Sequence, residues 1–102
     1  MARQEGDLPA ARTAFEDSLK IRRALADRDP KNTEWQRDLS VSFNKLGELC
    51  ETTGAVDEAL RLYGLSLPIA ERLAARAPTH VQFQSDLQIT RRRIEQLQAK
   101  LS

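Results

Sequence analysis

The side chains best suited to chemistry in this sequence are one thiol, one imidazole and a run of three guanidinium groups. Cys50 is the only cysteine and His80 the only histidine, so a metal site built from several such ligands is excluded. A Cys–His pair for nucleophilic catalysis would require Cys50 to leave the apolar helix stripe in which it falls. We therefore interpret Cys50 as a core residue, and His80, in a turn beside a helix start, as a capping or exposed residue.

The strongest local charge cluster is Arg91, Arg92 and Arg93. Three consecutive residues on a helix point in three directions, and no aromatic residues are interleaved to stack on bases, which argues against nucleic-acid binding. The acidic residues fall on helix faces of mixed sign, without an isolated carboxylate pair. We therefore expect no catalytic, cofactor-binding or metal-binding residues, no cofactor and no enzymatic activity.

Composition bounds the remaining classes of function. The 102 residues fit one domain, 1–102, with 30% charged and 40% hydrophobic residues, as in a folded soluble protein. The 16 basic and 15 acidic residues leave a net charge of +1, so no global field indicates a nucleic-acid or lipid partner. No apolar run approaches the roughly 20 residues of a membrane span, and residues 1–6 lack the apolar core of a secretory signal. We expect a cytoplasmic protein without membrane contact.

The chain contains an internal repeat. A shift of 48 residues lays 6–49 over 54–97 without a gap and gives 13 identities in 44 pairs, where composition alone gives roughly three. The identical pairs are Gly6/Gly54, Ala11/Ala59, Ser18/Ser66, Leu19/Leu67, Ile21/Ile69, Leu25/Leu73, Ala26/Ala74, Arg28/Arg76, Pro30/Pro78, Gln36/Gln84, Asp38/Asp86, Leu39/Leu87 and Leu49/Leu97. Two copies of one structural unit are therefore predicted.

Apolar residues at spacings of three and four predict four helices, at about 7–28, 33–52, 55–76 and 79–101. Pro30, Gly54 and Pro78 separate them, because proline disfavours helix at the preceding residue and glycine ends helices. No stretch alternates as a strand does. The short links predict that consecutive helices pack side by side and antiparallel.

Helix ends and one internal proline add local expectations. Asn32 or Thr33 is predicted to cap the second helix, and Thr79 to form a capping box with Gln82 at the last. Pro68 falls inside the third helix, where it lacks an N–H and crowds a carbonyl, so we expect it to bend or locally open that helix.

The central stretch 43–66 resembles a tetratricopeptide repeat, whose motif places aromatic, Leu-Gly, Gly, Ala, aromatic and small residues along two helices. The matching residues are Phe43, Leu46, Gly47, Gly54, Ala59, Tyr63 and Ser66. Cys50 stands where an aromatic is usual, Glu71 stands where proline is usual, and Pro78 comes seven residues late. Two extra turns on each helix lengthen a repeat of 34 residues to 48. The unit is similar to long bacterial repeats and, more loosely, to those of kinesin light chains.

Each tetratricopeptide repeat consists of a first and a second helix. In this alignment the four predicted helices correspond, in chain order, to a second, a first, a second and a first helix. The chain is thus either a segment of a longer array or a unit whose end helices act as caps. The resemblance implies an all-α fold of antiparallel helical hairpins, a tetratricopeptide-like solenoid fragment of four helices. In long bacterial members such arrays commonly form one part of a signalling or regulatory protein, which implies an adaptor role.

Tetratricopeptide arrays usually bind partner segments on the concave face formed by their first helices. Carried over to 32–52 and 79–102, this implies a partner-binding set of Asn44, Lys45, Glu48, Arg92, Arg93 and Gln96. Lys45, Arg92 and Arg93 are suited to an acidic peptide, since arginine binds carboxylates through a bidentate fork. The alternative is an ordinary solvated polar face.

The leading interpretation is a non-enzymatic protein-interaction scaffold that binds a peptide or a neighbouring domain on this concave face. The alternative is a structural module that self-associates into a homo-oligomer through its end helices, whose apolar stripes lack intramolecular neighbours on one side. Those stripes include Phe15, Leu19, Leu87 and Ile94.

Overall fold

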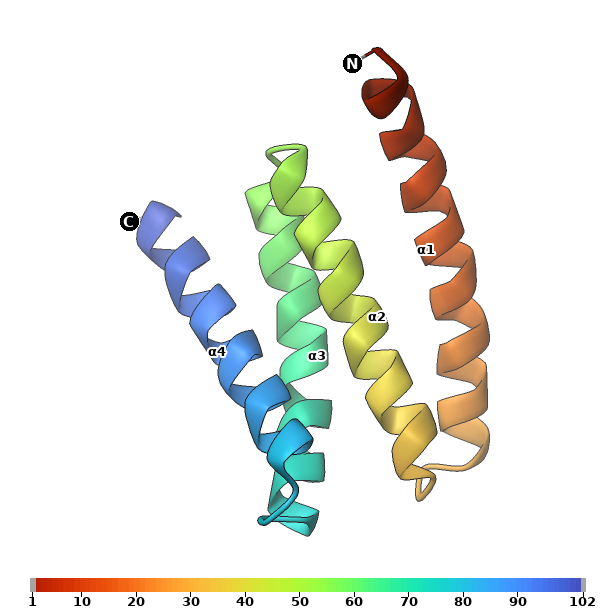
Figure 1. Cartoon of the computed structure of the whole chain (residues 1–102), viewed down its shortest axis with the longest axis vertical. Helices are drawn as coiled ribbons and strands as arrows, with labels where there is room; N and C mark the ends of the chain where they lie inside the picture. Colours follow the sequence, from red (N-terminus) through yellow and green to blue (C-terminus); the bar gives the residue numbers. More distant parts are fainter. Residues whose placement is uncertain (1, 102) are drawn as a thin grey trace.

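The computed structural model describes residues 2–101, and the side chains of residues 9–101. Four helices make up this part of the chain: α1 (Ala2–Arg28), α2 (Thr33–Thr52), α3 (Val56–Arg76) and α4 (Val81–Leu101) (Figure 1). No strand occurs between residues 2 and 101, so the predicted all-α class is confirmed. No helix in that range is both long enough and apolar enough to cross a membrane.

Consecutive helices run antiparallel and pack in chain order, α1 on α2, α2 on α3 and α3 on α4 (Figure 1). Side chains also join alternate helices. The Arg12 guanidinium on α1 pairs with the Glu58 carboxylate on α3, and Arg37 Nε on α2 lies 2.8 Å from Asp86 Oδ2 on α4. The molecule is a slab of 43 × 33 × 19 Å. Its continuation as a solenoid stays a prediction.

The core lies mainly on α2 and α3, because each has a packed neighbour on both sides. Only Ala26 of α1 is fully buried among the residues whose side chains are described. The buried hydrophobic residues of the other helices are Leu39, Phe43, Leu46, Cys50, Ala59, Leu62, Tyr63, Ile69, Ala70, Leu73, Ala74, Phe83, Leu87 and Leu97. Phe15, by contrast, remains 36% exposed on α1, although it corresponds in the repeat to Tyr63, which is 1% exposed.

The 48-residue repeat is visible in hydrogen bonds. Gln36 Nε2 donates to the Ala26 carbonyl at 3.2 Å, and Gln84 Nε2 donates to the Ala74 carbonyl at 3.0 Å. Both bonds satisfy a carbonyl near a helix end, where intrahelical partners run out. The same glutamine-to-carbonyl hydrogen bond therefore stabilises both equivalent helix–helix connections, α1 to α2 and α3 to α4. Gly6, the first residue of the aligned repeat, lies outside the described side chains.

Equivalent residues also cap α2 and α4. Asn32 Oδ1 accepts from the Trp35 N–H at 3.0 Å, and His80 Nδ1 accepts from the Phe83 N–H at 3.3 Å. The expected cap at Asn32 is confirmed, and so is the capping role of His80. The predicted capping box between Thr79 and Gln82 is wrong, because α4 begins at Val81 and the imidazole one residue earlier provides the acceptor.

Other boundaries follow the predictions closely, with two corrections. The first helix begins at Ala2 rather than near residue 7, because residues 2–5 are mostly good helix formers. The third helix continues as α-helix through Pro68, whose predicted local opening is therefore wrong. Gly54 ends α2 as expected, with a φ of 85° that an L side chain rarely adopts.

Candidate protein-binding surface

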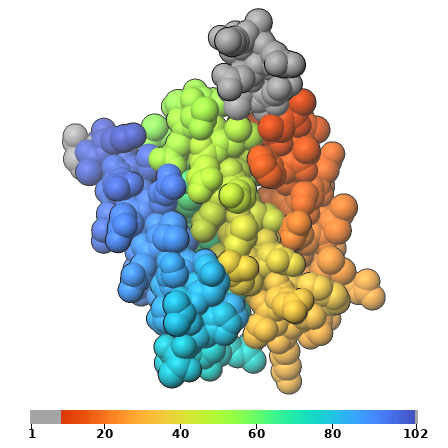
Figure 2. All heavy atoms as spheres, viewed as in Figure 1, coloured from red at the N-terminus to blue at the C-terminus, as the bar shows by residue number. Residues whose placement is uncertain are grey.

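The helices α2 and α4 lie side by side on one broad face of the molecule, which we name the α2–α4 face (Figure 2). Two interactions join them besides the pair of Arg37 with Asp86. Asn44 Nδ2 donates to Thr90 Oγ1 at 3.0 Å, and Arg93 of α4 reaches the acidic residues of α2. The Asn44 amide is therefore committed to helix packing rather than presented to a partner.

Arg93 is the most heavily engaged of the six predicted binding residues. Its Nη2 lies 3.7 Å from Glu48 Oε2, and its Nη1 lies 3.4 Å from Glu51 Oε1. The Tyr63 hydroxyl donates to the same Glu51 oxygen at 2.6 Å. Burial, followed by this hydrogen bond, raises the pKa of Tyr63 above its ordinary value. These four side chains link α2, α3 and α4, and the positive charge of Arg93 is largely neutralised by α2.

The remaining predicted residues, Lys45, Arg92 and Gln96, are exposed. Within residues 9–101, neither Lys45 nor Arg92 forms an ion pair. Lys45 is the repeat equivalent of Arg93, which reaches from α4 across to α2. It therefore belongs on the side of α2 that turns away from α4. The six-residue set as one partner-binding surface stays a prediction.

The arginine run separates as expected on a helix. Arg91 Nη2 lies 3.5 Å from Glu71 Oε2 on α3, Arg93 turns to α2, and Arg92 lies exposed between them. The three charges consequently do not form a single patch.

The two reactive side chains serve packing and capping. Cys50 is 1% exposed, and burial raises the pKa of its thiol, which disfavours the nucleophilic thiolate. The His80 ring stacks on Phe83, with centroids 3.7 Å apart and the planes 9° from parallel. Between residues 9 and 101, no three His, Cys, Asp or Glu side chains are arranged to hold a metal ion.

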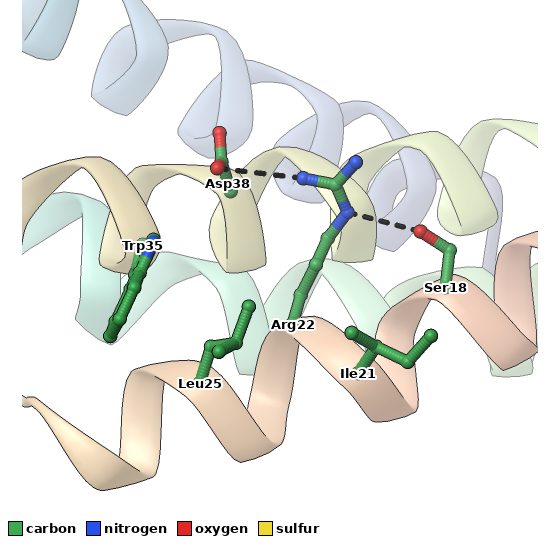
Figure 3. A pocket seen from close by; sticks show the side chains of 6 residues that line it. All are labelled: Ser18, Ile21, Arg22, Leu25, Trp35 and Asp38. Carbon is green, nitrogen blue, oxygen red and sulfur yellow. Dashed lines mark hydrogen bonds and ion pairs between the residues drawn. The ribbon is translucent and has the colours of Figure 1, made fainter.

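A concavity that we did not predict lies between α1 and α2, and we name it the α1–α2 groove (Figure 3). It encloses about 260 Å³ and is lined by Ser18, Ile21, Arg22, Leu25, Trp35 and Asp38. Ile21 is 64% exposed at its edge. Its lining residues come from two different helices. Helical periodicity defines the apolar face of each helix, but it does not predict which residues of the two helices come together. The signal that could have revealed the groove is the 48-residue repeat, which puts these lining residues in register with residues of α3 and α4.

Comparisons of the chain with models of protein families, with curated proteins and with solved structures found no match. The likeness to tetratricopeptide repeats therefore rests on the residues of this sequence.

Proposed function

We propose that this chain is a non-enzymatic protein-interaction scaffold that binds an acidic peptide, or an acidic segment of a neighbouring domain, on the α2–α4 face. The tetratricopeptide-like motif in 43–66 and its 48-residue repetition favour a binding role. A cytoplasmic setting, expected from the sequence, belongs to the same proposal.

The observation that carries the proposal is the unequal use of charge on this face. Three of its acidic groups are paired with its own cations, Glu48 and Glu51 with Arg93, and Asp86 with Arg37. Glu34 and Glu95, at its two ends, are exposed and form no ion pair in the described part of the chain. Lys45 and Arg92 remain exposed and without an ion pair in the described part of the chain. The middle of this face, where the acidic groups are neutralised and Lys45 and Arg92 face solvent, therefore favours carboxylates.

The test is selection of peptides from a random display library on the immobilised chain, followed by titration of the selected peptides in solution. We expect the selected peptides to be enriched in Asp and Glu. We also expect the double variant Lys45→Glu/Arg92→Glu to weaken their binding about tenfold or more, because it removes two attractive charges and adds two repulsive ones.

The matched control is Lys20→Glu/Arg28→Glu, which makes the same change in net charge at exposed positions of α1. It should bind as the unchanged protein does at physiological ionic strength, where distant charges are screened. Equal loss of binding in both variants would mean that the net charge of the protein, and not the positions of Lys45 and Arg92, determines binding. Undiminished binding by Lys45→Glu/Arg92→Glu would remove the α2–α4 face from the proposal.

A further inference from the structure

The α1–α2 groove is a second copy of the groove in which α2 itself lies. Shifting its lining residues by 48 positions reaches residues of α3 and α4 that enclose α2, and five of the six correspondences preserve chemistry. These are Ser18 with Ser66, Ile21 with Ile69, Leu25 with Leu73, Trp35 with Phe83, and Asp38 with Asp86. One copy of the groove is filled by a helix and the other is open.

In the filled copy, α2 satisfies both polar groups of the lining. The Ser40 and Ser66 hydroxyls lie 2.7 Å apart, and Ser66 Oγ also donates to the Ser40 carbonyl at 3.0 Å. Arg37 Nε donates to Asp86 Oδ2 at 2.8 Å. Between these polar contacts, the apolar residues of α2 share one buried cluster with those of α3 and α4.

In the open copy, the Arg22 side chain binds both polar groups of the lining, Ser18 and Asp38. Arg22 Nε donates to Ser18 Oγ at 3.0 Å, and Arg22 Nη1 lies 3.5 Å from Asp38 Oδ2 (Figure 3). The repeat equivalent of Arg22 is Ala70, which packs with Ala74 and Leu87 between α3 and α4 and cannot bind Ser66 or Asp86 as Arg22 binds Ser18 and Asp38. The Arg22 side chain is 42% exposed, so a surface ion pair and one hydrogen bond hold it in place.

We propose that the α1–α2 groove binds an amphipathic helix of a partner protein, which displaces Arg22. By equivalence with α2, this helix lies antiparallel to α1 and presents a Leu/Phe stripe to Ile21 and Leu25. It carries a basic residue that pairs with Asp38, as Arg37 pairs with Asp86. It has a glycine or another small residue opposite Phe15, as Gly47 lies opposite Tyr63. This groove lies on the side of α2 away from α4, the side to which Lys45 also turns, and it adds a second binding site to the function proposed above.

A second copy of the chain is a poor occupant. Within residues 2–101, its other helix of the α2 type is α4, which the repeat places in register with α2. At the positions of Ser40, Phe43 and Gly47, α4 carries Gln88, Arg91 and Glu95. A Cβ at Gly47 already comes within 3.0 Å of the Tyr63 ring, so a glutamate in that place conflicts with Phe15. The groove therefore favours a helix of the α2 type, with a small residue opposite Phe15, over α4 of a second copy.

The probe for this site is a synthetic peptide with the sequence of residues 33–52, the one helix whose fit to the filled copy is established. With a fluorophore at its N-terminus, it is titrated by anisotropy against the full chain and three variants. Arg22→Ala restores the residue of the filled copy, Ile21→Glu places a charge in the groove, and Ile89→Glu is the matched control. Ile89 is 45% exposed on α4, away from the groove.

We expect the unchanged protein to bind the peptide and Arg22→Ala to bind it about fivefold more tightly, because no surface ion pair has to be broken. Ile21→Glu should weaken binding about tenfold or more, and Ile89→Glu should leave it unchanged. In the peptide, Arg37→Glu and Gly47→Leu should each weaken binding, the first through Asp38 and the second through Phe15. Circular dichroism checks that each protein variant is folded. If Arg22→Ala does not fold, the difference in peptide affinity between the unchanged protein and Ile21→Glu tests the proposal.

Three outcomes would overturn the proposal. The first is absence of binding to the unchanged protein and to Arg22→Ala at about 1 mM peptide, beyond the range of specific helix recognition. The second is equal binding by Ile21→Glu, which would mean that the peptide replaces α2 in its own groove. The third is a concentration-dependent dimer, measured by light scattering, that Ile21→Glu abolishes, because the occupant would then be a second copy.

Discussion

Gly47 of α2 lies directly against the ring of Tyr63 on α3. A Cβ built at Gly47 would stand 3.0 Å from both Tyr63 Cε1 and Tyr63 Cζ, closer than side-chain carbons normally approach a ring. Glycine at this position therefore lets α2 and α3 approach closely. It belongs to the Leu46-Gly47 pair of the tetratricopeptide-like motif.

Replacing Gly47 by alanine should lower the free energy of unfolding by about 1–3 kcal/mol, because the added Cβ would displace the ring of Tyr63, which is 1% exposed and packed in the core. The matched control is Gly64→Ala. Its Cβ would meet nothing within 4 Å, so the better helix propensity of alanine should raise stability by about 0.5–1 kcal/mol. Urea denaturation of both variants measures this. Equal effects of the two substitutions would show that helix propensity, and not the ring contact, governs position 47.

The buried pair of Ser40 and Ser66 should be strongly coupled. Alanine at either position leaves the other polar group poorly satisfied in the core, at a cost of about 1–3 kcal/mol. The double variant removes both hydroxyls and should lose less than the sum of the two single changes. A double-mutant cycle measured by thermal unfolding gives the coupling, and strict additivity would contradict this interpretation.

Stability should fall at alkaline pH because of Tyr63. Burial and the Glu51 carboxylate raise its pKa in the folded state above the ordinary value of 10.0, so the unfolded chain ionises first. The contribution is fully present below pH 10 and is lost as pH rises through the folded-state pKa. Tyr63→Phe should remove this Tyr63 contribution to the decline while lowering stability at neutral pH through loss of the hydrogen bond. An unchanged alkaline profile in Tyr63→Phe would assign the decline to other groups.

The ion pair between α1 and α3 should act in the opposite pH range. The hydrogen bond from Arg12 lowers the pKa of Glu58 below its ordinary value of 4.5. Its stabilising effect is therefore present above about pH 4.5 and is lost as pH falls through the folded-state pKa. Glu58→Gln should flatten the acid limb of the stability profile, whereas Asp57→Asn, at an exposed neighbouring position, should not. Comparable flattening in both variants would point to net charge rather than to this pair.

The four helices could be predicted because the signals that determine them are local. Proline or glycine stands at each junction, and the apolar stripes repeat at helical spacing, so all four helices end at the expected residue. The core of α2 and α3 was found for the same reason, since residues such as Phe43 and Tyr63 lie on faces that the period already defines.

The candidate sites were harder to predict because they depend on which helices meet across the repeat. Arg93 was expected to be available to a partner, but its engagement with Glu48 and Glu51 depends on the lateral spacing of α2 and α4. Phe15 lies in a predicted apolar stripe, yet whether its side chain is buried depends on a neighbouring helix rather than on α1 itself. The role of Arg22 could be recognised only once Ser18 and Asp38 were seen within reach of one guanidinium.

The inner position of α2 and α3 has a consequence for how the molecule opens. Each end helix packs mainly on one partner, so α1 and α4 can detach while the inner pair stays folded. Amide protons of α2 and α3 should therefore exchange with solvent last, and those of α1 and α4 first. A helix bound beside α1 would then slow exchange at that end of the slab and leave α4 unprotected, which makes amide exchange a direct map of which edge is occupied.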